Sequence, residues 1–447
     1  MEIKKHHKLT SWQFIALGYV AVILIGSFLL SMPISTRDGS WTPYLHSLFT
    51  SVSATCVTGL AVYDTYIHWS IFGQFVILLL IQIGGVGFMT IITLFSLLIR
   101  RNIGIYERRI LMQSSGSMRA TGVVKLIQRI IFWTFIFEGA GFVLLSIRFC
   151  ADFGFIKGIY LALFHSVSAF CNAGFDLMGV IGEGASLIPY ATDPIVNLTI
   201  MALIFLGGLG FIVWTELIDN KFNPKKLSLH SKISIWASSI LVLLGALCFY
   251  LIERTNTLEG LNSFEALIVS LFQSVTPRTA GFKSVEMADL TDSAKLLISS
   301  LMFIGGNSGS TAGGIKTTTF VVLIFGIVAT ARGNTDIRIG KRRLDICLLT
   351  QACTILATYL IAIVTCTIII CAVEPYSLTA VLFETVSAMC TVGLSVGITG
   401  ELGSLSLILL MVLMYIGRVG IITLALAFFE KRSNPPLQRP LEKILIG

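Results

Sequence analysis

Apolar residues fill most of the chain in long stretches, separated by short polar or glycine-rich segments. Several stretches hold about 20 residues or more, the length an α-helix needs to cross a hydrocarbon core of about 30 Å. Others hold about 13 residues, and a helix of that length measures about 20 Å, too short to cross. The order long, short, long recurs four times. The pattern predicts an all-α polytopic membrane protein, because a β-barrel would show short alternating segments.

Four tandem repeats follow from this order, each with a spanning helix, a re-entrant pore helix and a second spanning helix. We expect eight spanning helices around one central pore, with the re-entrant segments entering from outside and turning back. The repeats cover residues 1–110, 111–228, 229–338 and 339–432, before a cytoplasmic tail at 433–447. The expected segments are 12–32, 43–55 and 70–98; 123–149, 157–170 and 194–217; 231–251, 264–276 and 294–330; and 345–372, 377–389 and 405–429.

Each short segment ends in a small or hydroxyl residue pair, a glycine and a bulky apolar residue. The glycines lie 115, 107 and 112 positions apart. Backbone that is not helical at membrane depth must be covered by protein or line water, and rings of backbone carbonyls can replace the hydration shell of an alkali cation. Turns that merely cap four helices remain the alternative, but four in register favour a cation-coordinating ring. The motifs are Val57-Thr58-Gly59, Asn172-Ala173-Gly174, Thr279-Ala280-Gly281 and Thr391-Val392-Gly393.

The second long segments carry a repeat of their own, Gly84-Gly85, Gly207-Gly208, Gly305-Gly306 and Gly417-Arg418. In the third repeat a glycine-rich stretch, 305–319, interrupts the segment, and each glycine costs about 1 kcal/mol of helix stability relative to Ala. We expect a broken helix that faces an aqueous cavity. A glycine-rich helix-packing face is the alternative. A phosphate loop is excluded, because the glycine and lysine of that motif must be adjacent.

Charge and composition fit a membrane protein. The 447 residues are 55% hydrophobic and 13% charged, with mean hydropathy +0.86 and net charge +8. The basic residues gather in five segments, which by the positive-inside rule lie in the cytoplasm together with both termini. That placement disfavours nucleic-acid binding and suits contact with anionic lipid headgroups. Nine dispersed cysteines form no CxxC pair, so neither a disulfide framework nor a zinc site is expected.

With its four motifs and this M1–P–M2 order, the chain resembles the Trk/Ktr/HKT superfamily of potassium-translocating proteins over nearly its whole length. Its size and short termini are most similar to the Ktr-type bacterial membrane subunit. The resemblance implies a multi-pass protein of the cell membrane that takes up K⁺ through a selectivity filter made by the four motifs. Glycine in all four motifs implies selectivity for K⁺, and the chain is expected to be no enzyme.

The same resemblance implies partners outside this chain. They are a second copy, forming a homodimer, and a cytosolic ring of RCK (KTN) regulatory subunits that carries ATP, ADP or NAD. No cofactor is expected in the chain itself, and K⁺ is the transported ion. The main alternative is a symporter that couples K⁺ to Na⁺ or H⁺. A membrane enzyme would need a convergent cluster of His, Asp, Glu or Cys, which the sequence does not show.

The resemblance also implies that residues 306–316 form an intramembrane loop that obstructs the pore. Arg418 replaces a glycine of the sister repeats, and an intramembrane Arg faces protein or water. We expect its guanidinium to hold carbonyls or hydroxyls of this loop; a structural salt bridge is the alternative. The expected gate consists of Gly306, Asn307, Ser308, Gly309, Ser310, Thr311, Gly313, Gly314, Lys316 and Arg418.

Other charged side chains receive structural interpretations. Glu138 and Glu384 are expected to be hydrogen-bonded carboxylates, and ion sites are the less favoured reading. Arg278 lies inside the longer stretch of the third motif, 274–282, and is expected to brace that turn against an outer carboxylate. His46 and His165 occupy unrelated repeat positions, so they indicate no metal site.

Overall fold

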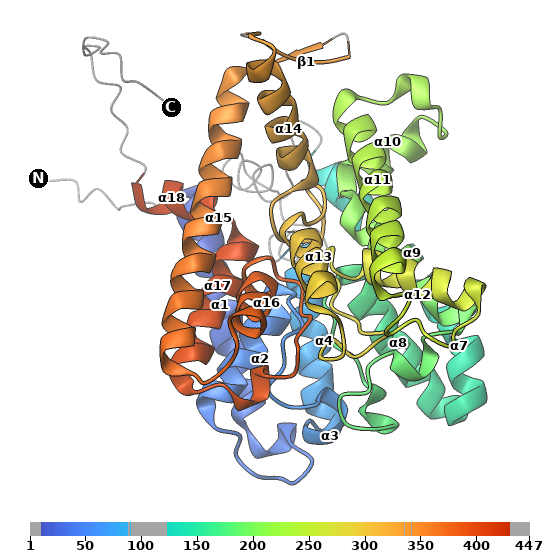
Figure 1. Ribbon diagram of the computed structural model, residues 1–447. Coiled ribbons are helices and arrows are strands. Elements are labelled where there is room, and N and C mark those ends of the chain that lie inside the picture. Colours follow the sequence, from blue (N-terminus) through green and yellow to red (C-terminus); the bar gives the residue numbers. More distant parts are fainter. Residues whose placement is uncertain (1–9, 88–89, 91–122, 335, 341, 430–447) are drawn as a thin grey trace, which may run out of the picture.

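The computed structural model describes residues 10–87, 90, 123–334, 336–340 and 342–429, and these are mainly helical, with connecting loops and one hairpin (Figure 1). The N-terminal tail, most of the basic segment 100–129 and the tail beyond 429 therefore lie outside the described residues. So does the part of the expected helix 70–98 beyond residue 90, and position 90 is described in isolation.

Four long apolar helices match the first spanning helix expected in each repeat. They are α1 (Ser11–Ser31), α7 (Val123–Phe153), α11 (Leu229–Glu253) and α15 (Ile346–Val373). Short polar side chains fix where three of them begin, because Thr10, Ser228 and Asp345 accept hydrogen bonds from first-turn backbone N–H groups. Each is long and apolar enough to cross a membrane.

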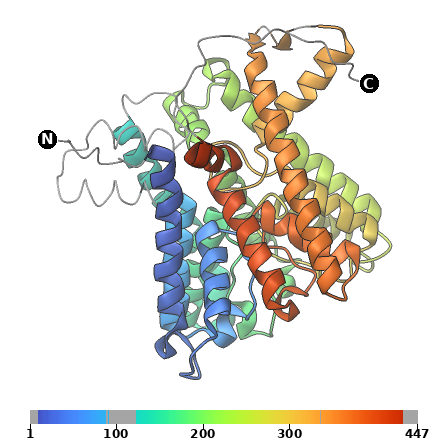
Figure 2. The same cartoon turned by 90° about the vertical axis from the view of Figure 1, so that its left-hand side faces the viewer.

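A shorter helix packs against each long one (Figures 1 and 2). With 12 to 17 residues, these helices are too short to cross a bilayer. Their last turns are almost completely buried, although they end in non-helical backbone. The four are α2 (Tyr44–Cys56), α8 (Phe155–Cys171), α12 (Ser263–Val275) and α16 (Leu378–Met389).

The second long helix of the first, second and fourth repeats differs from the sequence-based expectation, in which only the second helix of the third repeat was broken. Helix α4 (Ile71–Val86) ends at Gly87, α9 (Pro194–Leu209) meets α10 (Phe211–Asp219) at 95°, and α17 (Ser404–Val419) meets α18 (Ile421–Phe429) at about 90°. Each break falls on a glycine with φ between 87° and 100°, which side-chain-bearing residues rarely adopt. Four described helices are long enough to span, or six if each bent pair counts as one.

The second long helix of the third repeat is interrupted, as the sequence analysis expected. Helix α13 (Asp292–Phe303) and helix α14 (Thr317–Ala331) are separated by residues 304–316, called here the 304–316 loop. An antiparallel hairpin, β1 (Ile337–Ile339) and β2 (Arg342–Leu344), follows α14, and the sequence analysis did not predict it. The remaining short elements are η1 (Pro33–Ser35), α3 (Thr65–His68), η2 (Met178–Val180), η3 (Ile188–Tyr190), η4 (Pro224–Lys226) and η5 (Thr399–Glu401).

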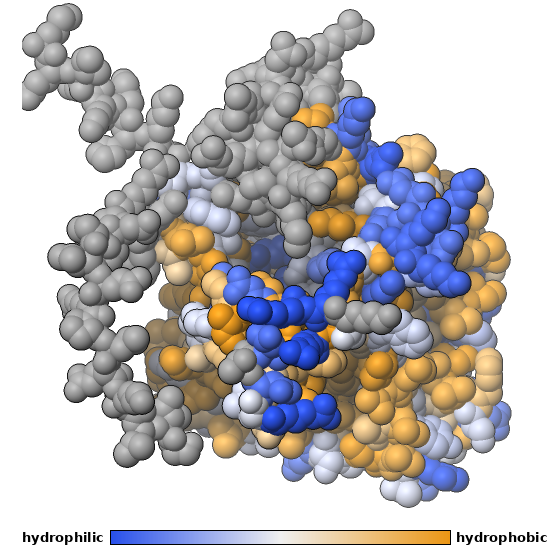
Figure 3. All heavy atoms as spheres, turned by 90° about the horizontal axis from the view of Figure 1, so that it is seen from above, coloured by the Kyte–Doolittle hydropathy of each residue, from blue (hydrophilic) through white to orange (hydrophobic). Residues whose placement is uncertain are grey.

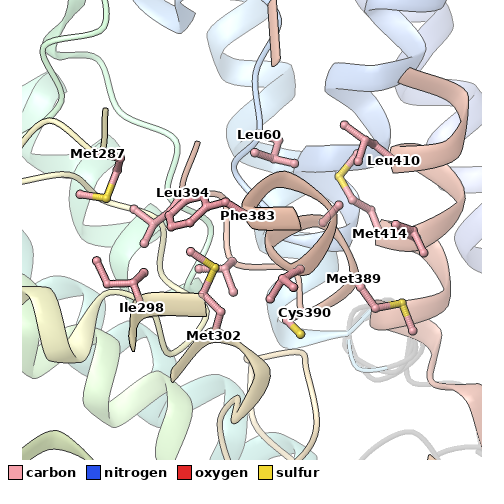
Figure 4. Close-up of a cluster of buried hydrophobic side chains, with 14 of the residues drawn as sticks. Leu60, Met287, Ile298, Met302, Phe383, Met389, Cys390, Leu394, Leu410 and Met414 are labelled. Atoms are coloured by element: carbon pink, nitrogen blue, oxygen red, sulfur yellow. The ribbon is translucent and has the colours of Figure 1, made fainter. Parts of the chain in front are cut away.

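Apolar side chains cover the flanks of the molecule as well as filling its interior. Ile25, Phe135, Leu243 and Ile361, one from each long helix, are all more than 60% exposed. Figure 3, viewed from the hairpin end, shows hydrophilic side chains gathered over that end. One core cluster joins segments far apart in the chain, with Leu60 and Leu394 near Phe383 and Met414 (Figure 4). An apolar belt with polar ends is the surface expected of a membrane protein.

Candidate functional site

The four short helices end in turns that share two positions with positive φ. In each turn a left-handed residue follows the helix, and the motif glycine comes two positions later, also with positive φ. The left-handed residues are Val57 (φ 59°), Asn172 (60°), Thr279 (73°) and Thr391 (51°), and the glycines are Gly59 (95°), Gly174 (70°), Gly281 (81°) and Gly393 (92°).

Hydrogen bonds from the helix end fix the turns. Thr58 N donates to Ser53 O at 2.8 Å, and Ser53 Oγ accepts from Gly59 N at 3.1 Å. The second and fourth turns repeat the backbone bond through Ser168 and Ser387. In the third turn Thr276 takes this place, with its Oγ1 donating to Phe282 O at 2.7 Å. A buried hydroxyl beneath each turn therefore explains why Ser or Thr recurs there.

The four motif glycines meet in a closed ring. A methyl group on Gly59 would lie 2.4 Å from the carbonyl oxygen of Ala173, and one on Gly174 would lie 2.6 Å from that of Ala280. The series continues from Gly281 to the oxygen of Val392 at 2.4 Å, and from Gly393 back to that of Thr58 at 2.1 Å. Real Cβ atoms do not approach so closely, so only glycine fits at each corner. Each corner thus places a backbone carbonyl against the next turn.

A cavity of about 320 Å³ lies on one side of this ring, and all four motif glycines line it. We call it the vestibule. Its walls also hold Asp64, Asp176, Glu183 and Lys283. Asp176, in the segment between α8 and α9 outside the membrane-crossing helices, has its pKa raised to about 6, chiefly by burial and secondarily by Asp64. The vestibule therefore presents, close to the ring, a carboxyl group whose pKa lies nearer to neutral pH than usual.

The 304–316 loop lies on the opposite side of the ring. A methyl group on Gly313 would lie 2.0 Å from Oγ1 of Thr391, the residue two positions before Gly393. Ile304 and Ile315 pair as an isolated parallel bridge, Gly305 N donates to Ile315 O at 3.0 Å, and Thr317 N donates to Gly306 O at 3.0 Å. The two ends of the loop are thus joined in a neck.

The body of the loop rests on the repeated glycines of α9. Asn307 N donates to Gly208 O at 2.9 Å and Thr311 N to Gly207 O at 3.2 Å, while Phe211 N donates to Gly309 O at 2.7 Å. Within the loop, Ser310 Oγ donates to Asn307 O. Glycine at 207 leaves the room for this packing, since a methyl group there would lie 2.0 Å from Phe170 O and 3.0 Å from Thr311 Oγ1 of the loop.

Arg418 makes the contact expected of it. Its Nη1 donates to Thr311 O, and its Nη2 donates to Gly84 O and to Gly85 O, the latter at 3.2 Å. Lys316 Nζ donates to Ala312 O at 2.5 Å, and Ser308 Oγ lies 3.1 Å from Thr318 Oγ1. Among the described residues Arg418 has no salt-bridge partner, so the salt-bridge alternative finds no support there. The expected gate residues, including Gly314 with φ 67°, do lie together.

Several hydroxyls at the turns are fully buried without a hydrogen-bond partner. They are Oγ1 of Thr55, Thr58, Thr279 and Thr391. A buried hydroxyl normally finds a partner, so an unsatisfied set deserves an explanation. Together with the carbonyls of the ring they offer neutral oxygen atoms, which are suitable ligands for a dehydrated alkali cation. In the described part of the chain, no group of three or more His, Cys, Asp or Glu could hold a metal ion.

Arg278 corrects the sequence-based expectation, because none of the described carboxylates contacts it. It is 7% exposed, and its donors reach Ser238 O at 3.2 Å, Ser238 Oγ at 3.1 Å, Gly305 O at 3.4 Å and Thr317 Oγ1 at 3.1 Å. The side chain therefore points to the neck of the 304–316 loop. No sequence signal placed it there, because its partners lie on other elements.

The two carboxylates that the sequence assigned to structure are hydrogen-bonded. Glu384 accepts from Ser395 Oγ at 2.5 Å, Val396 N at 3.1 Å and Thr399 Oγ1 at 2.9 Å. Glu138 accepts from Gln82 Nε2 at 3.3 Å. These contacts fit the structural interpretation of both residues.

Comparison with known proteins agrees with this arrangement. A family model described as TrkH, cation transport protein, matches residues 10–435. The chain is 37% identical to the potassium/sodium uptake protein NtpJ of Enterococcus hirae, over 100% of this chain and 99% of that protein. It is 36% identical to the Ktr system potassium uptake protein B of Bacillus subtilis, with coverage of 100% and 99%.

A solved structure shares the fold. The crystal structure of the potassium transporter TrkH from Vibrio parahaemolyticus matches with a TM-score of 0.74 and 18% identity, over 96% of this chain and 87% of that one. The family match covers most of the chain, and the Ktr and NtpJ relatives align over nearly their whole length. The chain is therefore a multi-pass membrane protein that belongs to the TrkH family of cation transport proteins.

Proposed function

We propose that this protein takes up K⁺ across the cell membrane through a carbonyl-lined selectivity filter, driven by the membrane potential. The closed ring of Gly59, Gly174, Gly281 and Gly393 carries the proposal. Each of the four motif glycines lies against a backbone oxygen of the next turn, and unpaired hydroxyls lie among the described residues of the turns. Neutral oxygens bind an alkali cation without trapping it, as conduction requires. The names of the NtpJ and Ktr relatives support K⁺ as the ion.

The proposal includes four M1–P–M2 units around this filter, with the vestibule facing outward and the hairpin end facing the cytoplasm. The short helices α2, α8, α12 and α16 are the re-entrant pore helices. Basic residues of the hairpin end, such as Arg338 and Arg343, support this orientation through the positive-inside rule. Both termini then lie in the cytoplasm.

The 304–316 loop acts as the gate. It lies against Thr391 on the inner side of the ring, and Arg418 holds it by Thr311 O. A cation passing the filter would meet both this loop and the positive charge of Arg418, so the loop must move for conduction. We further propose that the protein is a homodimer, regulated by a separate ring of cytosolic RCK subunits that bind ATP, ADP or NAD.

Uptake of ⁸⁶Rb⁺ into liposomes that contain the purified protein tests the function. Under an inside-negative voltage we expect uptake that K⁺ inhibits at lower concentration than Na⁺. Gly59→Ser should abolish this preference, because a side chain cannot fit at the ring. Deletion of 306–316 should raise uptake, and the short neck lets Gly305 be joined to Thr317.

The name of the Enterococcus relative, potassium/sodium uptake protein, keeps coupling to Na⁺ as a second candidate. The same liposomes separate the two mechanisms. A channel-like protein takes up ⁸⁶Rb⁺ on voltage alone, whereas a symporter requires a gradient of Na⁺ or H⁺. Uptake that fails without such a gradient would refute the channel-like proposal.

A further inference from the structure

Arg278 belongs to two functional parts at once. Its backbone lies in the third turn, between Thr276, which caps the helix, and Thr279, the left-handed residue. Its guanidinium lies at the neck of the 304–316 loop, where it donates to Gly305 O on one side and to Thr317 Oγ1 on the other. The third is the only turn among the four motifs that contains an Arg.

Arg278 contacts the chain on both sides of the neck, at Gly305 and at Thr317. Thr317 Oγ1 also donates to Gly305 O at 2.8 Å, so these two residues and Arg278 form a triangle of hydrogen bonds. Two further bonds to Ser238 fix the guanidinium to helix α11. The described residues include no carboxylate in ion-pair contact with Arg278, so the carbonyl and hydroxyl oxygens balance its charge. A planar fork with several donors suits this geometry, and an ammonium group does not.

Arg418 holds a different part of the same loop. It reaches Thr311 O, in the body of the loop, and the last turn of α4. Movement of the loop body must break this contact, whereas the neck can stay closed while the body swings. The two arginines therefore hold the loop at separate points.

We propose that Arg278 is a positioning residue that anchors the hinge of the gate and couples it to the selectivity filter. The inference rests on the proposed function of this site. When the neck loosens, the Arg278 side chain loses its hydrogen bonds and no longer holds the third turn in place. The ring then loses its alignment at Gly281. Arg418, by contrast, controls only whether the loop body is in place.

Two pairs of substitutions test the anchor. Arg278→Lys keeps the charge and removes the fork, and Arg418→Gln serves as the comparison at the loop body. Thr317→Val removes one partner hydroxyl at nearly constant volume, and Thr317→Ser retains it. The Thr317 pair keeps the test usable should Arg278→Lys fold poorly.

Hydrogen–deuterium exchange supplies a readout that does not depend on transport. The reporters are the amides of Gly305 and Thr317 in the neck and of Ala280 in the turn, all hydrogen-bonded in the structure. We expect Arg278→Lys and Thr317→Val to raise exchange about tenfold at both places. Arg418→Gln should raise it only in the loop body, and Thr317→Ser should match wild type. Unchanged exchange at Ala280 in both neck variants would overturn the coupling.

Uptake of ⁸⁶Rb⁺ gives the functional counterpart. Arg418→Gln should raise the rate and leave the ratio of Na⁺ to K⁺ needed for half-inhibition unchanged. Arg278→Lys and Thr317→Val should raise the rate and lower that ratio several-fold. A side chain that only braced helix α11 would lower the yield of folded protein without changing the ratio. Wild-type protein that takes up no ⁸⁶Rb⁺ would refute the proposed function, while the exchange result would still decide the coupling.

Discussion

Arg418 and Arg278 show that the type of a side chain alone does not predict its role, which depends on the groups that it contacts. Arg418 could be assigned from the sequence, because an arginine replaces a glycine in a repeated pattern and must find oxygen atoms inside the membrane. Arg278 could not, because its partners Ser238, Gly305 and Thr317 lie on other elements and share no spacing with it. The repeat therefore predicts residues that differ between sister positions, but not which elements of one repeat a side chain joins.

Removal of the Arg418 side-chain charge should favour the open state. A hydrogen bond from a charged donor contributes about 1.5–3 kcal/mol, and its loss in the closed state shifts the equilibrium about 10- to 100-fold. We therefore expect Arg418→Gln to increase ⁸⁶Rb⁺ uptake per folded protein by up to that factor. Ser300→Ala, on the exposed face of α13, provides a control for substitution in the repeat that carries the 304–316 loop but away from its contacts. Unchanged uptake in well-folded Arg418→Gln protein would contradict the proposal that Arg418 holds the 304–316 loop closed.

Asp176 should make uptake depend on the pH at the vestibule. Its pKa is raised from 3.8 to about 6, first by burial and then by Asp64, while the hydrogen bond from Met178 N, Ser186 and Lys283 act in the opposite direction. Above pH 6 the carboxylate attracts cations, and its protonation below pH 6 removes a charge worth about twofold in local cation concentration. We expect the half-saturating ⁸⁶Rb⁺ concentration to rise as the pH falls through 6, and Asp176→Asn to remove this dependence.

The same titration has a stability counterpart with a definite sign. The folded state binds the proton of Asp176 more tightly than the unfolded state does, so stability from this group is present below pH 3.8 and is lost as the pH rises through 6. Asp176→Asn should therefore raise the thermal midpoint in detergent at pH 7.5 and have little effect below pH 3.8. A variant equally destabilised at both values would contradict the assignment.

At the scale of elements, the sequence predicted the long and short helices well and the shape of the second helices poorly. Hydrophobic length distinguishes a helix of 21 residues from one of 13, which is why α1 and α2 fall within a residue or two of the expected bounds. The 95° bend at Gly210 was missed, because an apolar run reads the same whether straight or bent. The breaks fall on Gly87, Gly210 and Gly420, each three positions after the first glycine of the repeated pattern. This recurring glycine was the signal in the sequence that could have predicted them.

The bend between α9 and α10 should be necessary for a closed gate. Gly210 has φ +100°, and a methyl group there would lie 2.9 Å from Ser308 O in the loop. Gly210→Ala should cost about 1–3 kcal/mol in strain and weaken the bond from Phe211 N to Gly309 O, so uptake should rise while the melting temperature falls. Gly260→Ala is the matched control, since φ is +83° there but no atom lies within 4 Å. Equal uptake by the two variants would contradict a role for the bend.

At the scale of the whole molecule, the filter is assembled from four turns that lie far apart in the sequence. Each turn is bonded to the end of its own helix, whereas the 304–316 loop is bonded to other repeats through α9 and Arg418. We expect the current through reconstituted protein to reverse near the equilibrium potential of K⁺ when only K⁺ gradients are varied. A reversal potential that follows the H⁺ or Na⁺ gradient would contradict a channel-like path.

The closed ring also has a consequence for biosynthesis. Gly393 completes the ring by meeting Thr58, so the last corner arrives only when the fourth repeat has been inserted beside the first. Until then a growing chain holds three turns, and the ring is open on the side of Thr58. Membrane-inserted chains truncated before residue 393 are therefore expected to be unable to discriminate between cations, and quality control in the cell would have to recognise them before they leak.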